Sequence, residues 1–229
     1  MEMWLDLSLT TLVLIAAYLL GSIPTGYLAG RWLKGIDIRE YGSGSTGATN
    51  VLRTLGKVPA VVVLLVDAFK GVAAIAAVAP ALKAIALIKA FYALDLTTIP
   101  ASWQPWLVAG AGFAAILGHS KSIWLNFTGG KSVATSLGIL LTMSWQVGLG
   151  TLGVFAIALG LSRIVSLSSI VGAIAVGLLM IIFKQPLPYQ LFAGAAGLYV
   201  ILRHGSNIER ILSGNEPQIG QSLPQVSNK

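Results

Sequence analysis

The sequence predicts an all-α integral membrane protein with seven transmembrane helices in one domain, residues 1–214, followed by a polar, flexible tail, residues 215–229. Three observations predict this fold: the composition, the length of the apolar runs, and the distribution of Lys and Arg. Of the 229 residues 55% are hydrophobic and 10% charged, and the mean hydropathy is +0.82, outside the range of soluble domains. The 26 glycines suit close helix packing in lipid. Because no cysteine is present, disulfides and a cysteine nucleophile are excluded.

Apolar runs provide the expected spans, and they cover residues 7–33, 58–80, 106–118, 133–162, 164–183 and 187–202. The first run has no basic flank before it and no small-residue cleavage pattern after it, so it predicts a retained span. The run 133–162 would be about 45 Å long as a single helix, whereas the hydrocarbon core is about 30 Å thick. Two shorter helices that turn between Ser144 and Gly150 therefore fit better.

The cations distinguish seven spans from six. With seven spans and an outside N-terminus, eleven cations face the cytosol: Arg31, Lys34, Arg39, Arg53, Lys57, Lys121, Lys131, Arg163, Arg203, Arg210 and Lys229. Lys83, Lys89 and Lys184 then face outward. Six spans would leave eight cations inside and six outside, so the positive-inside rule favours seven, with a cytosolic C-terminus. Segments 34–57, 119–132 and 203–216 then share the cytosolic face, and 81–105 faces outward.

Charge has two further consequences. The net charge of +7 is explained by membrane topology, and no nucleic-acid partner is expected. Asp67 and Lys70 lie three residues apart inside the second span and therefore share a helical face. Such an intramembrane pair either fixes helix packing as a neutral unit, which we favour, or takes part in function.

The first polar motif runs from Gly42 to Asn50 and is followed by Arg53. Glycines allow backbone N–H groups to turn toward an anion, and such nests bind phosphate. A dinucleotide fold is rejected because no strand precedes the glycines, and a P-loop is rejected because Ala48 stands where its lysine is required. A flexible loop between spans is the alternative.

Two further motifs follow. In Gly118–Ser120 with Phe127–Thr135, paired glycines precede Lys131 at an expected helix start, so N–H groups, helix dipole and ammonium would converge on an anion. Arg203–Arg210 with Glu216 is the third motif, which could equally be a membrane-edge anchor. The charge argument places all three motifs on one membrane face. Together they predict a site for two phosphates, suited to transfer of a lipid-linked group onto a soluble phosphorylated acceptor.

Three segments carry a resemblance: Gly21–Pro24 with Gly42–Arg53, Gly118–His119 with Gly129–Thr135, and His204–Asn207 with Arg210 and Glu216. On these residues the chain resembles the bacterial acyl-phosphate:glycerol-3-phosphate acyltransferases known as PlsY, over nearly its whole length. The resemblance implies a seven-span enzyme of the bacterial inner (plasma) membrane with a cytosolic active site. It also implies that an acyl phosphate donates a fatty acyl group to the 1-hydroxyl of glycerol 3-phosphate. The products are lysophosphatidate and phosphate, in the first step of phospholipid synthesis.

The resemblance also implies roles for single residues. The implied catalytic residues are Ser43, Arg53, Lys131, His204, Asn207 and Glu216. The implied substrate-binding residues are Gly42, Gly44, Gly47, Thr49, Asn50, His119, Gly129, Gly130, Ser168, Ser169 and Arg210. Which serine of 166–169 enters the site stays open. The sequence departs from the family pattern at Ser45, Ser132 and Lys121, all in the polar loops.

An acyl phosphate carries a good leaving group, so positioning and anion stabilisation matter more than a strong nucleophile. Either the donor phosphate or His204 accepts the hydroxyl proton.

The acyltransferase class with Asp five residues after His is disfavoured, because Trp124 follows His119 and Glu209 follows His204 at that spacing. A small transporter of phosphorylated or acidic solutes is the alternative, although no internal repeat is visible. No cofactor, metal or obligate protein partner is expected.

Overall fold

The computed structural model describes residues 2–91 and 101–221, and these residues form eleven α-helices and no β-strand. Side chains are described from residue 6 onward, Ala101 excepted. Parts of two predicted segments, 92–100 of the outward loop and 222–229 of the tail, lie outside the described residues. The helices are α1 Glu2–Ser22, α2 Thr25–Lys34, α3 Ala48–Leu55, α4 Lys57–Ala76, α5 Val78–Phe91, α6 Gln104–Ser120, α7 Val133–Met143, α8 Trp145–Ser162, α9 Val165–Ile182, α10 Leu187–Leu202 and α11 Gly205–Leu212.

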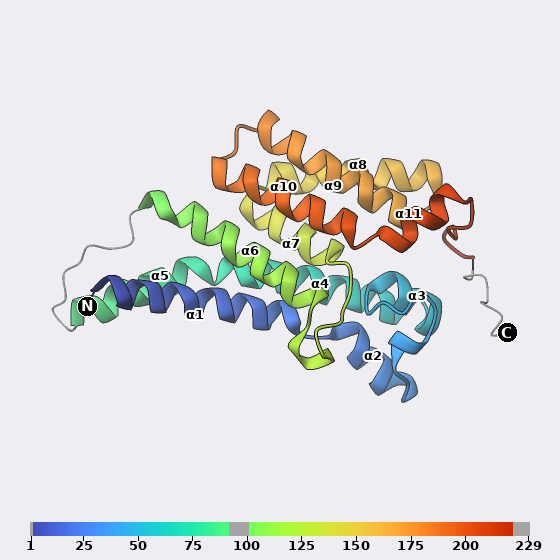
Figure 1. Cartoon of the computed structure of the whole chain (residues 1–229), viewed down its shortest axis with the longest axis horizontal. Helices are drawn as coiled ribbons and strands as arrows, with labels where there is room; N and C mark the ends of the chain where they lie inside the picture. Colours follow the sequence, from blue (N-terminus) through green and yellow to red (C-terminus); the bar gives the residue numbers. More distant parts are fainter. Residues whose placement is uncertain (1, 92–100, 222–229) are drawn as a thin grey trace.

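The long helices lie side by side, and the short helices α2, α3 and α11 gather at one end of them (Figure 1). Helix α1 packs against α6, α4 packs against α7, and α9 packs between α8 and α10. Four helical segments in the described ranges are long and apolar enough to cross a membrane: Asp6–Lys34, Lys57–Phe91, Trp145–Ser162 and Val165–Ile182. Large apolar side chains such as Phe69, Ile157, Leu161 and Leu198 lie exposed on the long helices, as expected for surfaces that contact lipid.

The first apolar run differs from its prediction, because residues 7–33 form two helices. Helix α1 ends at Ser22, and α2 begins at Thr25. Pro24 lies between them, and a proline lacks the N–H that a continuous helix would need there. Helical structure after the second run also extends further than predicted, since α5 continues to Phe91 through a segment rich in Ala, Leu, Ile and Lys.

The run 133–162 follows its prediction and forms two helices. Helix α7 ends at Met143, Ser144 has an extended backbone with φ −157°, and α8 begins at Trp145. The shorter helix α7 packs closely against α4 through small residues: a Cβ at Gly138 would lie 1.9 Å from the carbonyl oxygen of Ala68. This close approach places the middle of α7 beside the middle of α4.

Candidate active site

A cavity of about 450 Å³ lies between α3 and α4 on one side and α7, α9 and α10 on the other. Its apolar walls come from long-helix side chains, among them Leu64, Leu137, Leu140, Phe155 and Val176. Its polar end is lined by Ser43, Ser45, Gly47, Thr49, Asn50, Arg53, Asp67, His119, Lys131, Ser132, Ser166, Ser169, His204, Asn207 and Glu216. All six residues predicted to be catalytic therefore line one cavity, although they come from three distant segments.

Asn50 organises the loop before α3. Its amide nitrogen donates to the carbonyl oxygens of Ile38, Tyr41 and Ser45 at 3.1, 3.0 and 2.8 Å, and its Oδ1 accepts the Ser43 N–H at 2.8 Å. Gly42 adopts a left-handed conformation, φ +57°, and a Cβ there would lie 2.2 Å from Asn50 Oδ1. The side chain of Asn50 therefore shapes the loop that presents Ser43. Gly42 and Gly44 also shape this loop and do not line the cavity.

Arg53 lies one helical turn after Asn50, at the wall of the cavity. Burial lowers the pKa of its guanidinium, Glu216 opposes this shift, and Arg210 adds to it. Arg53 forms no hydrogen bond or ion pair with any residue in 2–91 or 101–221. Its planar donors are therefore available to an anion in the cavity.

The turn before Lys131 is built by close packing around Gly130. The Gly130 N–H donates to the carbonyl oxygen of His119 at 3.2 Å, and a Cβ at Gly130 would lie 2.2 Å from His119 Nε2. Arg203 donates to the carbonyl oxygens of Gly129 and Gly130 at 3.4 and 3.3 Å. The glycine pair thus makes room for His119, and neither glycine lines the cavity. This differs from the expectation that both amides face an anion, because the Gly130 amide is engaged inside the loop.

Lys131 begins a polar chain across the cavity. Its Nζ donates to Asn207 Oδ1, and Asn207 Nδ2 donates to Glu216 Oε1 at 2.6 Å. Glu216 also accepts from Ser166 Oγ at 2.7 Å and from Arg210 Nε at 2.7 Å. Burial would raise the pKa of Glu216, but these hydrogen bonds outweigh it and lower that pKa. The carboxylate is therefore held ionised, and it aligns three donors around the polar end.

The Lys131 ammonium is unusual for its low proton affinity. Burial is the main cause that lowers its pKa from 10.5 to about 8. Glu216 opposes this shift, whereas the nearby cations Arg210, Arg203 and Arg53 add to it. An anion in the cavity would restore the charged form, because it supplies the missing opposite charge.

His204 lines the cavity as a neutral imidazole. Its Nδ1 lies 2.7 Å from the carbonyl oxygen of Val200, which can only accept, so we assign the proton to Nδ1 and leave Nε2 unprotonated. Burial lowers the pKa of His204 to about 4, against a smaller opposing effect of the Val200 hydrogen bond. Its Nε2 can accept a hydrogen bond at neutral pH but binds a proton weakly.

The serines at the start of α9 differ in whether they line the cavity. Ser166 and Ser169, three residues apart, line the cavity, and Ser166 donates to Glu216. Ser168 does not line it: its hydroxyl is fully buried and donates to the carbonyl oxygen of Ile164 at 2.8 Å. Of the two serines predicted to bind substrate, only Ser169 faces the cavity. Ser166 could have been chosen over Ser168 only if the helix start had been known.

Helix N-termini add positive potential to the polar end. The caps of α3, α7, α9 and α11 make no side-chain capping hydrogen bond, and Thr49, Val133, Ser166 and Asn207 of the first turns line the cavity. Uncapped N–H groups and the helix dipole favour an anion. Among the described residues no group of three or more His, Cys, Asp or Glu could hold a metal ion.

The cavity joins a polar end with cations and helix N-termini to apolar walls among membrane-type helices. This is the arrangement expected of a helical membrane protein that binds an anionic amphipathic molecule. The chain belongs to the glycerol-3-phosphate acyltransferase family, whose sequence model matches residues 11–214. It is 63% identical over 228 residues to the glycerol-3-phosphate acyltransferase of Trichormus variabilis, covering 97% of this chain and 96% of the relative. The corresponding Trichodesmium erythraeum protein is 58% identical over 226 residues, covering 95% of each chain.

Solved structures are similar as well. The crystal structure of PlsY, an integral membrane glycerol 3-phosphate acyltransferase, in its glycerol 3-phosphate form matches with TM-score 0.76 and 35% identity, covering 92% of this chain and 96% of that chain. The lysophosphatidic acid form matches with TM-score 0.74 and the same identity, covering 92% and 95%. The resemblance found in the three motifs is confirmed, and the chain is an all-α integral membrane enzyme of this family.

Proposed function

We propose that this enzyme transfers a fatty acyl group from an acyl phosphate to the 1-hydroxyl of glycerol 3-phosphate, giving lysophosphatidate and inorganic phosphate. One observation carries the proposal: a single cavity joins apolar walls, which suit an acyl chain, to a polar end with Arg53 and Lys131. The glycerol 3-phosphate and lysophosphatidic acid named for the two PlsY structures fit the acceptor and the product. Nothing in the site or the relatives favours a transporter.

The proposed reaction is one substitution at the acyl carbon. The acceptor's 1-oxygen forms the new C–O bond, the bond from the acyl carbon to the phosphate oxygen breaks, and the phosphate leaves with the hydroxyl proton. Arg53, Lys131 and the helix N-termini stabilise the two phosphates as charge moves onto the leaving group. His204, with a pKa of about 4, is a weak base, which favours the donor phosphate as proton acceptor.

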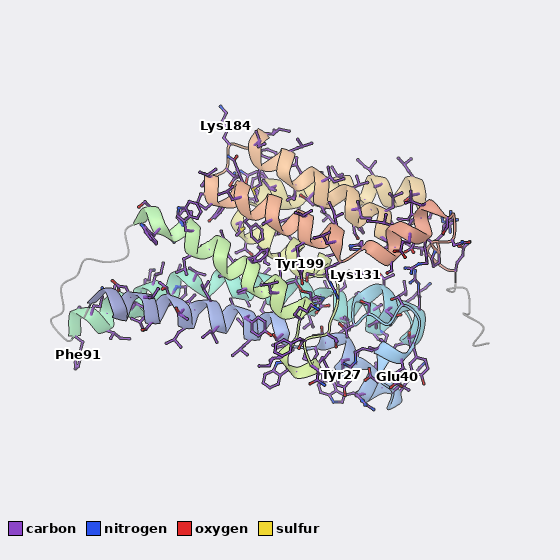
Figure 2. The ribbon with its side chains drawn as sticks, viewed as in Figure 1. Tyr27, Glu40, Phe91, Lys131, Lys184 and Tyr199 are labelled. Atoms are coloured by element: carbon purple, nitrogen blue, oxygen red, sulfur yellow. The ribbon has the colours of Figure 1, made fainter. Side chains whose placement is uncertain are left out.

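The proposed topology uses α1, α4, α6, α7, α8, α9 and α10 as the seven spans, with the N-terminus outside and the C-terminus in the cytosol. In Figure 2 Phe91 lies at the left end of the molecule and Lys184 at the left end of its upper helices, whereas Glu40 lies toward the right, where Figure 1 places α2 and α3. This separation supports placing the two sets of loops on opposite faces of the membrane, and the positive-inside rule then assigns the end with α2 and α3, and the site, to the cytosol of a bacterial plasma membrane. The acyltransferase domain, predicted as 1–214, is proposed to extend to Glu216, because that carboxylate lines the cavity.

The deciding experiment supplies purified protein, in lipid nanodiscs, with palmitoyl phosphate and labelled glycerol 3-phosphate. We expect labelled lysophosphatidate in equal amount to released phosphate. Palmitoyl-CoA and palmitoyl-acyl carrier protein serve as alternative donors, and Arg53→Gln protein serves as the inactive control. Product formation from a thioester alone would refute the acyl-phosphate donor. Uptake of glycerol 3-phosphate into proteoliposomes without product would support transport instead.

The proton acceptor has its own test in His204→Gln. We expect this variant to keep the shape of the wild-type pH–rate profile, because a glutamine can still hydrogen bond at the cavity wall and the donor phosphate takes the proton. Loss of an acidic limb from the profile, together with a large fall in kcat, would assign the proton to His204 and reject the donor phosphate.

A further inference from the structure

The intramembrane pair in α4 belongs to a buried polar network. Asp67 and Lys70 are 1% and 4% exposed, and Lys70 Nζ lies 2.9 Å from Asp67 Oδ1. Lys70 Nζ also donates to the carbonyl oxygen of Ile23 at 2.9 Å, and Thr25 Oγ1 donates to Asp67 Oδ1. The pair therefore satisfies the backbone at the break between α1 and α2. Neutralisation and packing explain these contacts.

One contact goes beyond packing, because Asp67 also faces His119. Asp67 Oδ1 lies 3.6 Å from His119 Nδ1, a buried atom that has no hydrogen-bond partner among the described residues. This distance is too long for a hydrogen bond, but a shift of a few tenths of an ångström would form one. On its other side the imidazole reaches the turn before Lys131, where Nε2 occupies the place of a Gly130 Cβ.

We propose that Asp67 and Lys70 position Lys131. Asp67 orients the His119 ring, His119 packs on Gly130, and this packing fixes the turn from which Lys131 reaches Asn207. Lys70 has a different role: it neutralises the Asp67 carboxylate. Without this partner the carboxylate, which lies at a phosphate-binding cavity, would repel the substrates. Both residues are assigned as positioning residues, since Lys70 and Thr25 both bind Oδ1 of Asp67, the oxygen that faces His119.

The inference rests on the proposed function only because acyl transfer is the activity that is measured. The test therefore uses whichever acyl donor supports turnover by the wild type. Failure of the acyl-phosphate donor therefore appears in the wild type, and failure of the inference appears only in variants. The main variant is Asp67→Asn/Lys70→Met, which removes both charges at similar volume and leaves no unpaired buried charge. Asp6→Asn/Lys89→Met is the control, because it removes another ion pair with a buried lysine and a partly buried aspartate, 2.7 Å apart, whose members do not line the cavity.

The expected results distinguish an effect transmitted through Lys131 from a general loss of stability. The Asp67→Asn/Lys70→Met variant should lose roughly tenfold to a hundredfold in kcat/KM, as small misplacements at an active site do, with a Tm no lower than that of the control pair. The loss should divide between KM and kcat as in Lys131→Gln. When Asp67→Asn/Lys70→Met is combined with Lys131→Gln, kcat/KM should fall little further than in Lys131→Gln alone, because the effects of residues that act through one contact are non-additive.

A second variant keeps the test decisive if the neutral pair folds poorly. His119→Gln should show the same division between KM and kcat and the same lack of additivity with Lys131→Gln. Wild-type efficiency in Asp67→Asn/Lys70→Met would overturn the inference. So would losses that multiply fully with Lys131→Gln, or an equal loss in the Asp6→Asn/Lys89→Met control, since each outcome reduces the pair to helix packing.

Discussion

Removing the ammonium of Lys131 should damage catalysis in a way that depends on pH. Its pKa of about 8, instead of 10.5, means that the free enzyme loses this charge early in the alkaline range. If the ammonium holds a substrate phosphate, kcat/KM, which reports groups of the free enzyme, should fall about tenfold per pH unit above that pKa. An ordinary lysine would keep its charge, and the activity, for about two further pH units.

The size of the effect follows from the site. Losing one cation from a desolvated anion site costs roughly 2–5 kcal/mol, a fall in kcat/KM of about thirtyfold to several thousandfold. Lys131→Gln should show this full loss at pH 7. At pH 9 the wild type itself keeps only about a tenth of its charge, so the ratio of wild type to variant should shrink about tenfold. Lys131→Arg should not rescue, because the turn is packed tightly at Gly130.

The assay is kcat/KM for glycerol 3-phosphate between pH 6 and 9.5, corrected for spontaneous hydrolysis of the acyl donor, with Tm measured in the same detergent. Lys57→Gln is the matched control, because Lys57 is exposed at the start of α4 and does not line the cavity. A ratio of wild type to Lys131→Gln that stays constant over this pH range would refute the reasoning. An activity loss that merely parallels a fall in Tm would refute it too.

Other predictions concern the remaining polar groups and the topology. Arg53→Gln should lose about thirtyfold or more in kcat/KM at unchanged Tm, and Arg53→Lys should rescue poorly because an ammonium lacks the planar fork of donors. Ser166→Ala should lower kcat/KM by about five- to a hundredfold, at roughly 1–3 kcal/mol for the Glu216 contact, whereas Ser168→Ala should have little effect on kcat/KM. An impermeant thiol reagent should label Lys184→Cys in intact cells. It should label Ser206→Cys, an exposed position, only after the cells are permeabilised. The reverse pattern would reject the proposed orientation.

Much of the polar lining of the cavity could be predicted, because the residue types themselves indicate anion binding. The polar segments of an otherwise apolar chain contain Arg53, Lys131, Asn207 and Glu216, and a shared site accounts for all of these segments at once. The turn near Ser144 could also be predicted, because bilayer thickness limits helix length. Composition and membrane physics thus constrain both features without knowledge of any side-chain contact.

Other features depend on contacts that a linear pattern does not encode. The choice of Ser166 over Ser168 requires the rotational phase of α9, which only its first residue sets. The contact between Asp67 and His119 joins residues 52 positions apart, and it arises from the packing of α4 and α6. The break at Pro24 did have a local signal, since a proline inside an apolar run interrupts a helix.

The environment of Glu216 resolves an apparent conflict, since a carboxylate in a cavity proposed to bind two phosphates should repel both. Its oxygens are occupied by Ser166, Asn207 and Arg210, so its charge aligns donors and neutralises one guanidinium. Without it, Asn207 would be free to rotate, and Lys131 would lose the fixed partner that Asn207 provides. The carboxylate thus adds some repulsion but holds its donors in place, and preorganised donors stabilise charge that develops in a transition state. The described residues 214–221 thus contribute Glu216 to the cavity, and the hydrogen bond from the Ile219 N–H to the Arg163 carbonyl, 2.8 Å, holds them against the start of α9.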